Sequence, residues 1–204
     1  MTILHNASEA EMVLAFLQEE MESCRFREEM FSALKECNVT EELIVHGDVM
    51  NATENALREK VLGKYRGYPD REIFKNYPAK IEWKRVRFEA EDLDRLRYIS
   101  YSYWDELSKG TSKPSDAAKT VNDGVEIFGV SNQYFLDGRD ALAQGKHFPP
   151  IIVLTDGNGP LVLIEGHCRA TCYALVPECF VDSEAYAGFC TTEEMLKFNP
   201  CMVK

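Results

Sequence analysis

Basic residues are scarce in this sequence. It contains 23 lysines and arginines against 34 aspartates and glutamates, which gives a formal net charge of −11 over 204 residues. A protein that coats DNA needs a basic face to neutralise the phosphates. The acidic balance therefore argues against DNA as a partner.

Long apolar runs are absent as well. No stretch approaches the roughly 20 residues that a membrane-spanning helix requires. The first lysine or arginine is Arg25, and Glu9 and Glu19 fall where a secretory signal would need basic and apolar segments. We therefore expect a cytoplasmic protein that does not contact a membrane.

Paired cysteine motifs are also missing. The seven cysteines include no Cys-x-x-Cys pair, and an odd number without a dense framework favours free thiols over disulfides. A zinc ion would need four ligands from the five C-terminal cysteines, whose spacings match no closed zinc motif. Burial as small apolar side chains is the interpretation we favour, and we predict no metal site. These five are Cys168, Cys172, Cys179, Cys190 and Cys201.

The first third of the chain has helical patterns. Residues Ser8 to Glu11 form a capping box, followed by apolar residues at helical spacing. A second helix is predicted to begin after Asn51 or Thr53 and to stop at Gly63. Nothing in this part indicates catalysis, so its predicted role is to bind a protein partner.

A glycine- and proline-containing connector marks the predicted domain boundary. Gly67, Pro69 and Pro78 lie among aromatic residues between the helical region and the next strand-like segment. We therefore predict a helical N-terminal segment over residues 1–77 and an α/β domain over residues 78–204.

Patterns in the second region predict alternating elements. They are a strand over 81–88, a helix over 89–108, a polar loop over 110–124 with a short helix near Ala117, and a helix from Ser131 to Gly145.

The strongest local signal follows. Two aliphatic runs, 151–154 and 161–164, flank a stretch of turn residues and predict a buried β-hairpin.

The segment after this hairpin carries the candidate chemistry. Gly166 separates the second strand from a predicted helix that ends before Pro177. A glycine there lets a ligand approach the backbone, and the first turn of the helix favours an anion. Arg169 adds a bidentate group suited to phosphate, and His167 adds a hydrogen-bond donor or proton carrier.

Three further residues complete the candidate site. Glu165, at the strand end, is a candidate general base or Mg²⁺ ligand. Thr171 is predicted to bond either phosphate or its own helix. Cys168 would have a stabilised thiolate at the helix N-terminus.

The same residues carry a resemblance to a known superfamily. Residues 149–154 followed by 161–171 resemble the core of the ParB-like/sulfiredoxin-like superfamily, whose members include CTP-binding partition proteins, ATP-using sulfiredoxins and free-serine kinases. The run from Glu165 to Arg169 is closest to the acidic-Gly-His-His-Arg turn of the serine kinases, with Cys168 replacing the second histidine. The resemblance implies a small mixed-sheet α/β (α+β) domain with a helical extension. It also implies ATP or CTP with Mg²⁺ as the ligand, bound through Gly166, His167 and Arg169.

The sequence departs from two branches of that superfamily. Sulfiredoxins place the reactive cysteine directly after the glycines, whereas here His167 comes first. Partition proteins have a double-arginine turn and a following helix-turn-helix domain, whereas this chain ends about 35 residues after Arg169.

Three functions from different classes are consistent with the sequence. The first is a nucleotide-dependent phosphotransferase or hydrolase with Glu165 and His167 as catalytic residues. The second is a nucleotide-gated regulatory module that binds without turnover. The third is thiol redox chemistry at Cys168.

Overall fold

The computed structural model describes residues 1–23 and 26–200, which divide into two compact units. One unit comprises residues 7–79, and the other comprises residues 1–6 together with residues 80–204. The segment expected to be helical from residue 1 begins instead with a strand, β1 (Thr2–Asn6). The partner of β1 is a strand about 80 residues further on, so no local pattern announces it.

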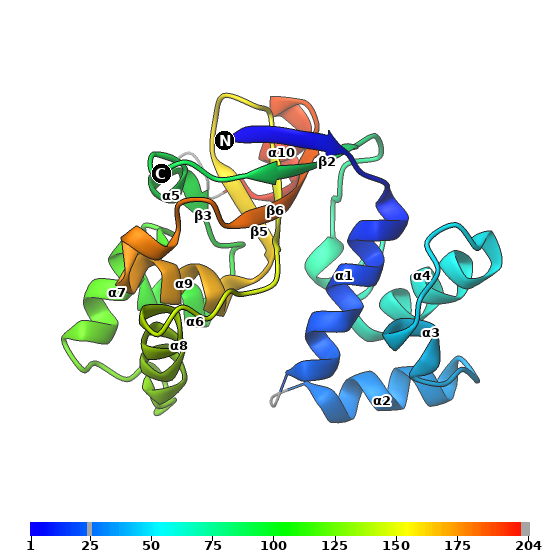
Figure 1. Cartoon of the computed structure of the whole chain (residues 1–204), viewed down its shortest axis with the longest axis horizontal. Helices are drawn as coiled ribbons and strands as arrows, with labels where there is room; N and C mark the ends of the chain where they lie inside the picture. Colours follow the sequence, from blue (N-terminus) through cyan, green and yellow to red (C-terminus); the bar gives the residue numbers. More distant parts are fainter. Residues whose placement is uncertain (24–25, 201–204) are drawn as a thin grey trace. The chain divides into compact units, whose positions relative to one another are not determined.

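The unit of residues 7–79 is helical, as expected. Its helices are α1 (Glu9–Glu22), α2 (Arg27–Glu36), α3 (Glu42–Val45), α4 (Ala52–Arg66) and the 3₁₀ helix η1 (Glu72–Phe74), and Figure 1 shows them from blue to cyan. The capping box is confirmed: Ser8 caps α1 while Glu11 bonds back to the Ser8 amide. Asn51 caps α4 through its side-chain oxygen.

Helix α4 continues past the predicted end at Gly63. It ends at Gly67, which adopts the left-handed conformation (φ +79°) that terminates helices. A glycine inside a helix costs only about 1 kcal/mol, so Gly63 alone does not stop it.

The second unit is built on one mixed sheet of six strands. The remaining strands are β2 (Glu82–Arg87), β3 (Leu96–Arg97), β4 (Ile151–Thr155), β5 (Leu161–Glu165) and β6 (Glu184–Phe189). Their order is β1-β2-β6-β4-β5-β3, in which the β4/β6 and β5/β3 pairs are parallel and the others antiparallel. The predicted hairpin is confirmed, because β4 and β5 pair antiparallel and are almost entirely buried.

Helices cover this sheet. They are α5 (Asp92–Arg95), α6 (Ser102–Leu107), α7 (Pro114–Asn122), α8 (Gln133–Ala143), α9 (His167–Leu175), the 3₁₀ helix η2 (Pro177–Cys179) and α10 (Thr192–Phe198). Figure 1 shows α6 to α9 gathered together, and α9 packs against both α7 and α8. Their apolar side chains join those of the sheet in one core, which includes Leu107, Val153 and Leu163.

The prediction of one continuous helix over residues 89–108 is wrong. That segment forms α5, then β3, then α6. Leu96 and Arg97 pair with β5, and the amide of Tyr98 donates to the carbonyl of Ser112. These backbone hydrogen bonds to distant residues form in place of the helical hydrogen bonds that the apolar spacing predicted.

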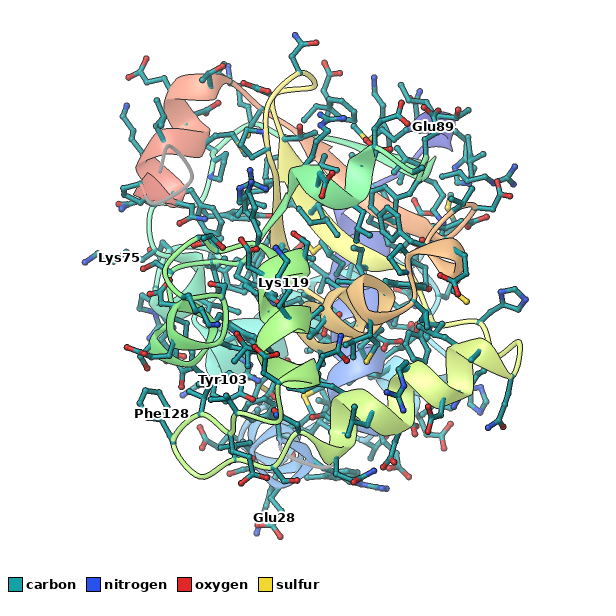
Figure 2. All side chains as sticks on the ribbon, turned by 90° about the vertical axis from the view of Figure 1, so that its left-hand side faces the viewer. Glu28, Lys75, Glu89, Tyr103, Lys119 and Phe128 are labelled. Atoms are coloured by element: carbon teal, nitrogen blue, oxygen red, sulfur yellow. The ribbon has the colours of Figure 1, made fainter. Side chains whose placement is uncertain are left out.

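The polar segment after residue 110 is more ordered than expected. It contains the nine-residue helix α7, which starts with Pro114 in its first turn. The next helix, α8, is preceded by Asn132 as its N-cap rather than by Ser131. Figure 2 shows Lys119 on α7 and Phe128 on the loop towards α8, where the Phe128 ring is exposed.

The predicted α/β class is confirmed by ten α-helices and six mixed strands within the described residues. Among the same residues, no helix is both long and apolar enough to cross a membrane.

Candidate functional site

The turn between β5 and α9 depends on Gly166. This residue is the N-cap of α9 and has φ +94°, a left-handed conformation that other residues adopt only with strain. A Cβ atom at this position would lie 2.5 Å from Cγ2 of Ile151, the first residue of β4. Both backbone conformation and close packing therefore require glycine.

Glu165 and Arg169 are brought together by this turn. Arg169 Nη2 donates to Glu165 Oε2, and Nη1 donates to the carbonyls of Pro149 (3.0 Å) and Pro150 (3.1 Å). The Arg169 side chain is 10% exposed and that of Glu165 is 17% exposed. Arg169 was predicted to bind phosphate, and Glu165 to act as a base or Mg²⁺ ligand. In the structure the two side chains form a largely buried ion pair instead. This pair fixes the start of β4 against α9.

His167 lies against two aromatic rings. Its imidazole stacks on Trp104 of α6 (centroids 5.3 Å apart, 20° between planes) and on Tyr98 (5.8 Å, 17°). Tyr98 and Trp104 also stack on each other at 4.8 Å. Two nearly parallel rings therefore hold the imidazole at the first turn of α9.

Thr171 supports this aromatic cluster from inside the helix. Its hydroxyl donates to the carbonyl of His167 (2.9 Å) and accepts from the hydroxyl of Tyr98 (2.7 Å). Thr171 is fully buried, and burial raises the pKa of Tyr98 well above its usual value. Thr171 was predicted to bond either phosphate or its own helix, and in the structure it bonds its own helix.

Two residues at this turn were not predicted from the sequence. They are Tyr98 and Trp104, and aromatic residues at helical spacing are usually structural. They are indeed buried, yet they also contact His167. The density of aromatic residues between positions 98 and 104 was the available signal.

The C-terminal helix reaches the same cluster. The side-chain amide of Asn199, directly after α10, donates to the carbonyl of Tyr98 (3.0 Å). Asn199 is 1% exposed. Tyr98 is therefore tied to α9 through its hydroxyl and to the residue after α10 through its backbone carbonyl.

Among the residues that the structure describes, no group of three or more His, Cys, Asp or Glu side chains could hold a metal ion. Cys201 lies outside those residues. Cys168 is partly buried in the first turn of α9. Cys172 is buried one turn later, where its thiol donates to the carbonyl of Phe135 (3.7 Å).

A cleft of about 450 Å³ lies beside the other end of α9. Its lining includes Arg85, Lys146, Tyr173 and Glu178. The predicted site residues do not line it. The cleft and the turn are related through Pro150, which lines the cleft and accepts a bond from Arg169.

Comparisons of the chain with family models, with curated proteins and with solved structures give no match. The resemblance to the ParB-like/sulfiredoxin-like superfamily therefore rests on the motif residues alone.

We predict that Cys172 and Cys190 resist alkylation in the native protein. Burial raises the pKa of each thiol to about 12, so almost no thiolate is present near neutral pH. Peptide mapping after brief iodoacetamide treatment should find both thiols unmodified, and both modified when urea is included. Equal labelling with and without urea would contradict the burial of these side chains.

Proposed function

We propose that this protein binds the phosphates of a nucleotide, ATP or CTP with Mg²⁺, at the first turn of α9. The observation that carries the proposal is the left-handed Gly166 between a buried strand and a nine-residue helix. The helix N-terminus that follows Gly166 has partial positive charge that favours phosphate.

The ion pair gives Arg169 a positioning role in this proposal. Its guanidinium is held by Glu165 and by two carbonyls, so it fixes the turn on which the phosphates would rest. The proposal gives His167 the role of donor to a phosphate, and the Tyr98 and Trp104 rings hold its imidazole at the same turn.

The geometry favours binding over turnover. A general base has to reach the proton that it removes, and the Glu165 carboxylate is committed to Arg169. We therefore favour the nucleotide-gated binding module over the phosphotransferase or hydrolase. In that module the helical unit of residues 7–79, with exposed Val45 and Met50, would bind the protein partner.

Nucleotide-dependent thermal stabilisation tests this proposal. ATP, CTP, GTP and ADP would be titrated with and without Mg²⁺ while unfolding is followed by tryptophan fluorescence. A nucleotide at about 100 times its Kd should stabilise the protein by about 2.7 kcal/mol. For a chain of this size that corresponds to a Tm increase of roughly 5–10 °C.

A charge substitution at position 168 provides the specific control. Cys168→Asp places a carboxylate in the first turn, where it repels phosphate. Because Cys168 packs partly against the core, the Tm of this variant without nucleotide is compared with that of Cys168→Asn. Cys168→Asn has nearly the same shape without the charge and should retain the nucleotide shift. The absence of a shift in the wild type, or an undiminished shift in Cys168→Asp, would overturn the proposal.

A further inference from the structure

The outer strand of the sheet, β1, has an exposed edge. It pairs with β2 on one side, and no strand of the described residues lies on its other side. All five of its residues are exposed, including Ile3 (51%) and Leu4 (36%). Figure 1 shows β1 in blue beside β2. Such an edge presents backbone groups that another strand can pair with.

β1 is short and has an irregularity in its register, two features that limit pairing at an edge, but its side chains do not protect it. The strand reads Thr-Ile-Leu-His-Asn and contains no lysine, arginine, acidic residue or proline. Leu4 is the extra residue at an irregularity in the register, because Ile3 pairs with Val86 and His5 with Arg85. Leu4 consequently has no counterpart in β2.

Charge does not oppose the approach of a second copy at this edge. The three cations of β2 each have an acidic partner within the same chain: Lys84 with Glu82, Arg85 with Glu184, and Arg87 with Asp182. The charges of these pairs cancel, and Glu89, which accepts from the Thr2 hydroxyl, pairs with the N-terminal amine of Met1, so this edge carries little net charge. A strongly charged partner would gain little here, whereas an identical neutral strand meets no like-charge repulsion.

We propose that β1 pairs antiparallel with β1 of a second copy of this chain, about a two-fold axis at Leu4. Thr2 then faces Asn6 of the copy, Ile3 faces His5, and Leu4 faces Leu4. The interface is self-complementary, as a two-fold dimer requires. It joins two six-stranded sheets into one and is independent of the nucleotide site.

The dimer should be weak and dependent on concentration. Five residues span only about 17 Å of strand. The pairing therefore buries less than the roughly 1,200–2,000 Å² of stable complexes. Sedimentation equilibrium from about 5 µM to about 500 µM, a range suited to weak association, should show the mass rising from 23.3 kDa towards twice that value.

Charge variants at Leu4 test the pairing itself. Leu4→Lys and Leu4→Glu each place like charges opposite one another, so each variant alone should remain monomeric at about 500 µM. An equal mixture should dimerise again, because lysine then faces glutamate. Met50→Lys, at an exposed methionine in the other unit, should dimerise like the wild type.

Three results would overturn the proposal. They are a wild-type protein that stays monomeric across the whole range, single variants that still dimerise, and a mixture that stays monomeric. Unchanged tryptophan fluorescence, to which Trp83 on the neighbouring strand β2 contributes, verifies that each variant is folded.

Discussion

Replacing Gly166 by alanine is expected to destabilise the unit of residues 1–6 and 80–204 by about 2–5 kcal/mol. The left-handed conformation costs an alanine about 1–2 kcal/mol. Its Cβ would also lie 2.5 Å from Cγ2 and 2.8 Å from Cβ of Ile151, and such overpacking typically costs about 1–3 kcal/mol more. The measurement is urea denaturation followed by tryptophan fluorescence. Both tryptophans, Trp83 and Trp104, belong to this unit.

Two other glycines separate the effects of conformation and packing. Gly110 (φ +80°) and Gly145 (φ +85°) are also left-handed, but a Cβ atom at either would meet no atom within 4 Å. Alanine at these positions should cost only about 1–2 kcal/mol. If Gly166→Ala proves no worse than these controls, Ile151 moves aside easily and the turn is less tightly packed than described.

Replacing Arg169 by methionine is expected to cost about 3–5 kcal/mol in the same denaturation experiment. The substitution keeps an apolar stem of similar length but leaves the largely buried Glu165 carboxylate without its cation. It also removes the donor to the carbonyls of Pro149 and Pro150.

The double variant Glu165→Gln/Arg169→Met distinguishes a lost ion pair from lost packing. Removing the negative charge together with the positive one should recover part of the stability, with a coupling of about 0.5–3 kcal/mol. Losses that simply add in the double variant would show that the pair contributes little. Arg169 would then act through its contacts with the two carbonyls.

The sequence predicts the requirement for Gly166 but not the pairing of Glu165 with Arg169. The requirement for glycine at 166 follows from its place between an apolar strand and a helix, and both elements have local signals. The pairing of Glu165 with Arg169 depends on the direction in which the left-handed turn sends the helix. Side-chain chemistry alone suggested a base and a phosphate ligand, because it does not reveal that the two groups neutralise each other.

The elements that sequence reasoning missed are those held by distant partners. β1 pairs across about 80 residues with β2, the strand that the sequence predicts over 81–88, and β6 pairs with β2 and β4. β6 contains two alanines and a glycine and so has little apolar patterning. Gly188 is nevertheless required there, because a Cβ would lie 2.6 Å from Ile81 and 2.8 Å from Leu154.

The amino-acid sequence by itself determined the α/β class, the capped start of α1, the β4–β5 hairpin and the glycine turn into α9. Each of these depends on contacts between residues close in the chain, so local pattern and turn chemistry suffice. The tertiary structure alone decided that Tyr98 and Trp104 stack on His167, and that Thr171 bonds Tyr98 rather than standing open to a ligand. Those contacts join residues about 60–70 positions apart, and their geometry exists only once the sheet has brought β3 beside β5.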